Sequence, residues 1–109
     1  MSSISMSDQS HLLDSTRTEL AQDYVGLWSI VREVRESTSD SNRVRELTLS
    51  LIRQLLEDPH VVAGEFVAGK FVRSSESPAI LINRIESQWK SGGREPDIGE
   101  IVWFAMSIP

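Results

Sequence analysis

The chain has 109 residues, a net charge of −5 at pH 7 and no cysteine. This length gives room for one domain, and the lack of cysteine excludes disulfides, thiol catalysis and cysteine-ligated zinc. The acidic balance argues against general binding to nucleic-acid backbones, which requires a positive surface. No apolar run approaches the ~20 residues that span a bilayer, and residues 1–10 lack the features of a signal peptide. We therefore expect a cytoplasmic protein with neither a nucleic-acid nor a membrane partner.

The N-terminal half predicts a flexible lead followed by two helices. Residues 1–12 are rich in serine and are expected to form the lead, with a single domain over 13–109. Thr16 and Glu19 have the spacing of a capping box, so the first helix is expected from about residue 14 to 36. Both helices carry an apolar stripe at helical spacing, the first Leu20, Tyr24, Leu27, Trp28, Val31 and Val34, the second Val44, Leu47, Leu51, Ile52 and Leu55.

The C-terminal half predicts three strands and one more helix. Two short strands are expected at about 60–63 and 70–73, where β-favouring residues alternate with glycines. Ser77 and Pro78 are a typical helix start, and Leu81, Ile85 and Trp89 continue it as a core stripe. The helix is expected to end with Gly92 as a left-handed cap. A positive φ is expected at Gly92, Gly93 or Gly99, the last of these in the turn before the final strand. The last strand is expected at about 100–106.

The predicted order is α-α-β-β-α-β. An antiparallel αα-hairpin and a third helix would pack on a small three-stranded sheet, which makes an α+β fold.

No residue pattern in the chain indicates catalysis, a cofactor or a metal. His11 and His60 have no second histidine at metal-ligand spacing, and the acidic pairs beside prolines are typical of turns. Neither a phosphate-binding loop nor a nucleophile elbow is present. We therefore assign no catalytic, cofactor-binding or metal residues and predict that the chain is not an enzyme. An enzyme with a site that spacing does not reveal is a third alternative.

The last strand is the candidate protein-binding site. It has apolar residues on both faces, and a chain of this size has few elements with which to cover both. An exposed Trp103 with Asp97 and Glu100 beside it would give the apolar centre and charged rim of a protein interface. The opposing interpretation is that the first helix folds across this face and buries it.

A second alternative rests on arginines. The first two helices carry Arg32, Arg35, Arg43, Arg45 and Arg53. A regulatory or nucleic-acid-associated module could use them. Acidic residues interleave with these arginines, which favours a solvated, ion-paired face.

Residues 84–90 and 93–104 read R-I-E-S-Q-W-K and G-R-E-P-D-I-G-E-I-V-W-F. They resemble the end of a family of small bacterial proteins without an established function, in which a helix ending in Trp leads to a G-R-x-P-x-x-G-[DE]-I-x-W-F element. The resemblance covers about residues 44–106, implies a fold and carries over no catalytic residue. Such small acidic proteins are similar in kind to immunity proteins. We therefore expect a non-enzymatic protein-binding domain, in its sharper form an immunity-type protein with a basic toxin as partner. The sequence leaves the oligomeric state open.

Overall fold

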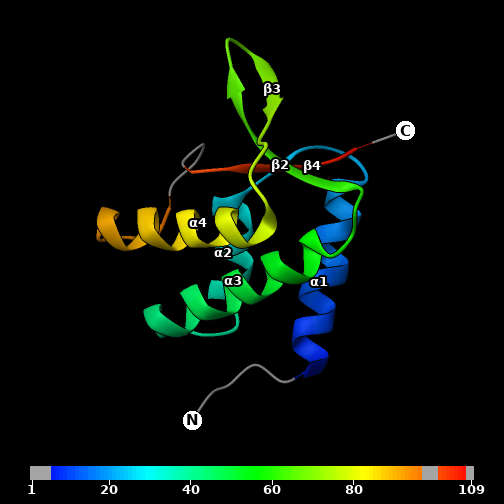
Figure 1. Cartoon of the computed structure of the whole chain (residues 1–109). Coiled ribbons are helices and arrows are strands. Elements are labelled where there is room, and N and C mark those ends of the chain that lie inside the picture. The colour runs from blue at the N-terminus through cyan, green and yellow to red at the C-terminus, as the bar shows by residue number, and fades with distance from the viewer. Residues whose placement is uncertain (1–5, 97–100, 108–109) are drawn as a thin grey trace.

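The computed structural model describes residues 6–96 and 101–107, and these form a sheet with the helices gathered on one side of it (Figure 1). The sheet has four antiparallel strands in the order β1-β4-β2-β3. The predicted α+β class is confirmed. In chain order the elements are α1 (Met6–Leu20), β1 (Val25–Gly26), α2 (Leu27–Arg35), α3 (Ser41–Leu56), β2 (Val61–Val67), β3 (Lys70–Arg73), α4 (Pro78–Gly92) and β4 (Trp103–Met106).

The region predicted as one first helix is two helices with a short strand between them, so that prediction was wrong. The chain leaves α1 after Leu20, and the Asp23 carboxylate accepts a hydrogen bond from the Tyr24 backbone N–H at 2.8 Å. Val25 and Gly26 then pair with β4, which adds a fourth strand to the three expected. Apolar residues recur at helical spacing through this region, but the pairing with β4 and the low helix propensity of Gly26 favour a strand at residues 25–26.

The start of α1 also differs from the prediction. The helix begins at Met6, inside the range expected as a flexible lead, and Leu12 is buried in the core. Thr16 is therefore in the middle of a helix rather than at its cap. Its hydroxyl donates to the Leu12 carbonyl at 2.9 Å, one turn back.

Several helix ends follow their sequence signals. The Asp40 carboxylate caps α3 by accepting from the backbone N–H groups of Asn42 and Arg43. The Ser77 hydroxyl caps α4, which has Pro78 in its first turn, and the helix ends at Gly93 with φ of 69°. The predicted helix start at Ser77 and a positive φ at one of the glycines considered are both confirmed, but the left-handed cap is Gly93 and not the predicted Gly92, which is still helical. Gly99, the other glycine considered there, lies outside the described residues.

The register assigns each strand residue to a face of the sheet. Val25, Ala63 and Phe104 are paired across neighbouring strands and belong to the buried core, so they lie on the helix-facing side. Gly26 and Gly64 are both paired with Trp103 and lie on the opposite side, here called the outer face. The helices therefore cover one face of the sheet.

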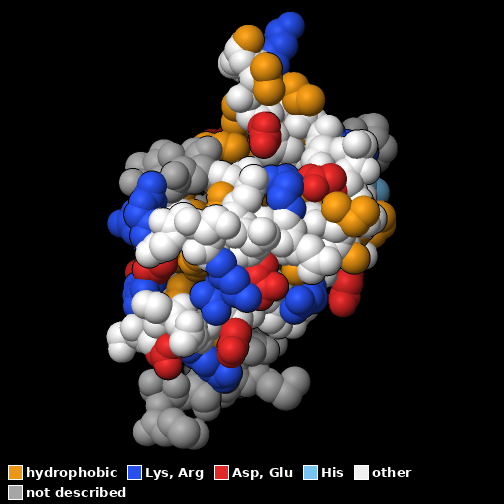
Figure 2. Space-filling view, turned by 60° about the vertical axis from the view of Figure 1, so that its left-hand side comes forward, with side chains coloured by type: hydrophobic (Ala, Val, Ile, Leu, Met, Phe, Trp, Pro, Cys, Tyr) orange, Lys and Arg blue, Asp and Glu red, His pale blue; other side chains and the backbone are white. Residues whose placement is uncertain are grey.

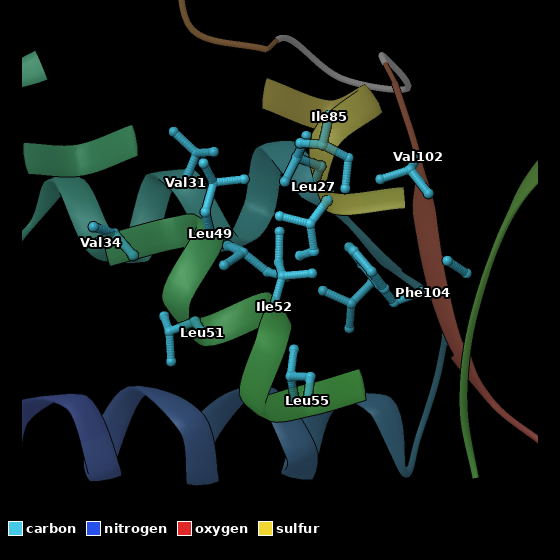
Figure 3. Packing of buried hydrophobic residues seen from close by; sticks show 14 of the residues in the cluster. Leu27, Val31, Val34, Leu49, Leu51, Ile52, Leu55, Ile85, Val102 and Phe104 are labelled. Atoms are coloured by element: carbon cyan, nitrogen blue, oxygen red, sulfur yellow. The ribbon is translucent and has the colours of Figure 1, made fainter. Parts of the chain in front are cut away.

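The core lies between that covered face and the helices. Figure 3 shows Phe104 of β4, and Val102 just before that strand, directed toward residues of α2 and α3, among them Leu27 and Ile52. Phe104, Leu27 and Ile52 are essentially inaccessible. Trp89 of α4 is also buried, as predicted. No helix in the described part of the chain has the length and apolar character needed to cross a membrane.

The β2–β3 hairpin projects beyond the rest of the molecule (Figure 1). Its two turn residues, Ala68 and Gly69, have φ of 51° and 80°. Positive φ at both positions is the pattern of a type I′ turn, whose twist suits a two-residue hairpin. The strand β2 is longer than predicted because it first pairs with β4 and then continues into this hairpin.

Candidate protein-binding surface

Four aromatic rings from four separate segments meet on the outer face of the sheet. We call Tyr24, Phe66, Phe71 and Trp103 the aromatic cluster. The ring centroids are 5.0 Å apart for Tyr24 and Phe66, 5.1 Å for Tyr24 and Phe71, and 5.7 Å for Phe66 and Phe71. Phe66 also contacts Trp103, at 5.2 Å. These separations and the mainly edge-to-face geometry are those of favourable aromatic pairs.

The cluster remains accessible to solvent. Tyr24 and Phe66 are 45% and 41% exposed, while Phe71 and Trp103 are half-buried. Figure 2 shows hydrophobic side chains gathered on the projecting hairpin. The interpretation that the first helix buries the outer face is therefore wrong for these rings.

Two glycines make room for the cluster. Trp103 is flanked in register by Gly26 on β1 and Gly64 on β2. A Cβ atom at Gly26 would lie 3.2 Å from the Trp103 ring, and one at Gly64 would lie 2.8 Å from the Phe71 ring. The absence of side chains at both positions allows the rings to lie close to the backbone of the sheet.

Trp28 lies beside the cluster instead of in the core, where it was expected. It is half-buried, and a Cβ atom at Gly26 would lie 2.6 Å from its Nε1. This indole N–H is buried and has no hydrogen-bond partner among the described residues. The indole therefore packs on the glycine backbone at an energetic cost for its unpaired donor.

Of the three residues predicted as the site, Trp103 belongs to the cluster, and Asp97 and Glu100 lie outside the described residues. Sequence reasoning missed Tyr24, Phe66 and Phe71. Tyr24 fitted the stripe of a helix that is in fact broken. The hairpin signal could have found the other two, because a two-residue turn at 68–69 places Phe66 opposite Phe71.

An apolar pocket adjoins the cluster at Tyr24. It has a volume of about 400 Å³ and is lined by residues that include Leu20, Tyr24, Ala105 and Met106. It lies where β4 continues past the short strand β1, so it extends the accessible apolar surface away from the hairpin.

A second groove, of about 540 Å³, lies on the other side of the hairpin, toward α4. Its polar wall is an ion pair in which the Arg84 Nε donates to both Glu76 oxygens at 2.9 Å. The Ser74 hydroxyl donates to the same carboxylate. Hydrogen bonds from Arg84 and from Ser74 keep the pKa of Glu76 below its ordinary value. The pair is thus a charged but internally compensated wall.

The arginines of the nucleic-acid alternative are partly engaged by acids. Arg35 of α2 forms an ion pair with Glu95 and donates hydrogen bonds to its carboxylate. These hydrogen bonds raise the pKa of the Arg35 guanidinium. Arg43 of α3 lies 3.6 Å from Glu46 one turn away. The Arg43–Glu46 contact follows the interleaving of charges seen in the sequence, whereas Glu95 reaches Arg35 from a distant part of the chain. Neither contact favours a phosphate-binding face.

His11 and His60 are both exposed, and the described residues contain no group of three His, Asp or Glu side chains placed to hold a metal ion. Comparison of the chain with protein-family models, with curated proteins and with solved structures gave no match.

Proposed function

We propose that this chain is a protein-binding domain whose contact surface is the aromatic cluster. The observation that carries the proposal is a packed group of four rings, two exposed and two half-buried, on a sheet face that the helices leave open. Aromatic residues are enriched in protein interfaces and supply many of their energetic hot spots. Isolated exposed apolar residues need no functional explanation, but a contiguous group does.

The packing of the aromatic cluster holds its side chains in place, which also favours binding. Each ring is held by at least one other ring, and Trp103 and Phe71 lie against glycine backbone. Side chains that are already fixed lose little conformational entropy when a partner covers them. An aromatic side chain has only two rotatable torsions, which reduces this cost further.

The immunity-type role is the finer form of this proposal. Its support is the small size and the net charge of −5, which would steer a basic toxin toward the protein. The charged side chains of the hairpin itself include Lys70 and Arg73, so the support for a basic partner comes from the whole molecule.

The experiment compares binding by Phe66→Ala and Ile80→Ala variants. Proteins captured from a lysate of the source cells by the immobilised wild-type chain are identified, and the strongest one is purified for calorimetric titration. Phe66→Ala should weaken its binding by about tenfold or more, as expected for a hot spot. Ile80 is also exposed and apolar but lies on α4, outside the cluster. The Ile80→Ala control should therefore bind like wild type.

Both variants should retain the wild-type circular dichroism spectrum, because both side chains are exposed. Trp103→Ala extends the test to the half-buried ring and should abolish capture of the partner. If Phe66→Ala and Trp103→Ala both bind the purified partner as tightly as wild type, the aromatic cluster is not the interface and the proposal fails.

A further inference from the structure

The strand β3 forms one edge of the sheet, and its backbone is oriented to accept another strand. The sheet order ends at β3, and none of the strands in residues 6–96 and 101–107 pairs with its outer side. The Ser74 N–H donates to the Ala63 carbonyl at 2.8 Å. This bond shows which residue pairs of the hairpin are the hydrogen-bonded ones. Because hydrogen-bonded and non-hydrogen-bonded pairs alternate along antiparallel strands, the backbone groups of Lys70 and Val72, like those of Ser74, bond inward to β2. The peptide groups of Phe71 and Arg73 therefore point outward.

The two faces of this edge differ in what they offer. On the outer face, Phe71 continues the aromatic cluster. On the opposite face, Val67 and Val72 are 54% and 51% exposed and line the groove between the hairpin and α4. Alternate side chains of a strand added here would thus meet an aromatic surface on one side and the groove on the other.

We propose that β3 receives an extended segment of the partner protein as a fifth strand of the sheet. This proposal rests on the protein-binding function proposed above and specifies its mode. Backbone hydrogen bonds to an exposed sheet edge supply affinity in this mode, and pockets for alternate side chains supply specificity. The fixed ion pair of Arg84 and Glu76 gives the groove a preformed wall, with Gln88 accepting from Arg84 at 3.1 Å.

The charges on the edge define the chemistry of the segment. Lys70 and Arg73 are exposed at the two ends of β3. A segment with apolar residues in its centre and carboxylates at its ends would complement both cations. A second copy of the chain would instead bring two Lys70 and two Arg73 side chains together, and edge cations of this kind oppose self-pairing. The occupant is therefore a segment of another protein.

The test uses a synthetic peptide, T-E-V-V-E-T with blocked ends, whose two glutamates have the same three-residue spacing as Lys70 and Arg73. Its binding is followed by amide hydrogen exchange, measured by NMR on the labelled chain. With peptide in millimolar excess, exchange at Phe71 and Arg73 should slow by about tenfold or more, because their outward N–H groups become bonded. Exchange at Lys70 and Val72 should change little, because these groups already pair with β2. No slowing at Phe71 and Arg73, or slowing confined to other residues, would overturn the proposal.

A pair of variants isolates the backbone contribution. Arg73→Pro removes the outward N–H at an edge position where proline is tolerated, and Arg73→Ala removes only the side chain. The proline variant should bind the peptide about tenfold more weakly than the alanine variant. Equal affinities would contradict strand addition. If Phe66→Ala weakens binding of the purified partner while these two variants bind that partner alike, the aromatic cluster is the interface and only strand addition fails.

Sedimentation equilibrium without peptide tests the choice of occupant. The chain should remain monomeric up to about 0.5 mM, well above the concentrations at which specific dimers form. A concentration-dependent dimer that protects the Phe71 and Arg73 amides would show that a second copy occupies the edge, and the proposed occupant would be wrong.

Discussion

The ring of Phe66 stands nearly perpendicular to the indole of Trp103, at an interplanar angle of 89° and a centroid distance of 5.2 Å. This contact joins the projecting hairpin to the central strand β4. Gly64 of β2 lies at the junction of the two regions, because it is paired with Trp103 of β4 on one side and with Arg73 of β3 on the other. Before Gly64 the strand β2 pairs with β4, and after it β2 pairs with β3. The orientation of the hairpin, and with it the whole aromatic cluster, therefore depends on the backbone at Gly64.

Gly64→Ala should disrupt this junction. An added Cβ would lie 2.2 Å from the Val72 carbonyl oxygen, a backbone atom that cannot move without the hairpin. We expect a loss of about 2–3 kcal/mol in the free energy of unfolding, measured by urea denaturation. Gly92→Ala is the control, because a Cβ there meets nothing within 4 Å and the residue is helical. It should be neutral or stabilise by up to about 1 kcal/mol. Equal stability of the two variants would contradict the close approach at Gly64.

Ala68→Asn should stabilise the hairpin. Ala68 has φ of 51°, in the left-handed region that costs a residue with a Cβ about 1–2 kcal/mol. Asparagine tolerates this region better and, before Gly69, completes the preferred sequence of a type I′ turn. We expect a gain of about 0.5–1 kcal/mol in thermal or urea unfolding. Ala79→Asn, on the exposed first turn of α4, should give no comparable gain. A decrease in stability for Ala68→Asn would argue against the turn geometry.

Local signals predicted much of this fold. Ser77 with Pro78 and the glycine turn at residues 92–93 each act within a few residues, so a single sequence is enough to identify them. The break after Leu20 could not be found this way. Residues 25–26 become a strand because β4, almost 80 residues later, pairs with them, and that contact is invisible to helical periodicity.

The candidate site was predictable only in part, for the same reason. Trp103 was identified because a strand with two apolar faces in a small protein must leave one face uncovered or recruit a cover. The other three rings depend on register. Phe66 and Phe71 come together through the hairpin turn. Tyr24 directly precedes β1, and it meets them on the outer face because β1 pairs with β4 and so joins the sheet. The charged rim at Asp97 and Glu100 lies outside the described residues and stays a prediction.

Two buried threonines should respond oppositely to replacement by valine. Thr48 of α3 is fully buried, and its hydroxyl has no partner among the described residues. Thr48→Val substitutes a methyl group for an unpaired polar group and should stabilise by about 1 kcal/mol in urea unfolding. Thr16→Val is the matched control, because the Thr16 hydroxyl donates to the Leu12 carbonyl at 2.9 Å. It should cost about 0.5–1 kcal/mol. Destabilisation of similar size at both sites would show that the Thr48 hydroxyl is satisfied in solution.

The stability of the protein should depend on pH through Glu33, which α2 directs toward α1. Burial, with a hydrogen bond and charge repulsion from Glu19, raises the pKa of Glu33 to about 7, while the Ser15 hydroxyl donates to its carboxylate at 3.4 Å. The ordinary pKa of a glutamate is 4.5. Between these values the unfolded chain has released this proton and the folded chain retains it, so the contribution of Glu33 to stability falls as pH rises.

Glu33→Gln removes this dependence. Near pH 4.5 and below, the group is protonated in both states, and the variant should be about as stable as wild type. Above pH 7 wild type must hold a charged carboxylate beside Glu19, so the variant should be more stable, by about 1 kcal/mol once solvent screening of this half-buried group is allowed for. Urea unfolding of both proteins at pH 5, 6, 7 and 8 measures the difference. Glu36→Gln removes a nearby negative charge that also raises the pKa of Glu33, so above pH 7 this variant should gain stability by a smaller amount than Glu33→Gln. A Glu33→Gln difference that does not grow between pH 5 and pH 8 would mean that Glu33 titrates near its ordinary pKa.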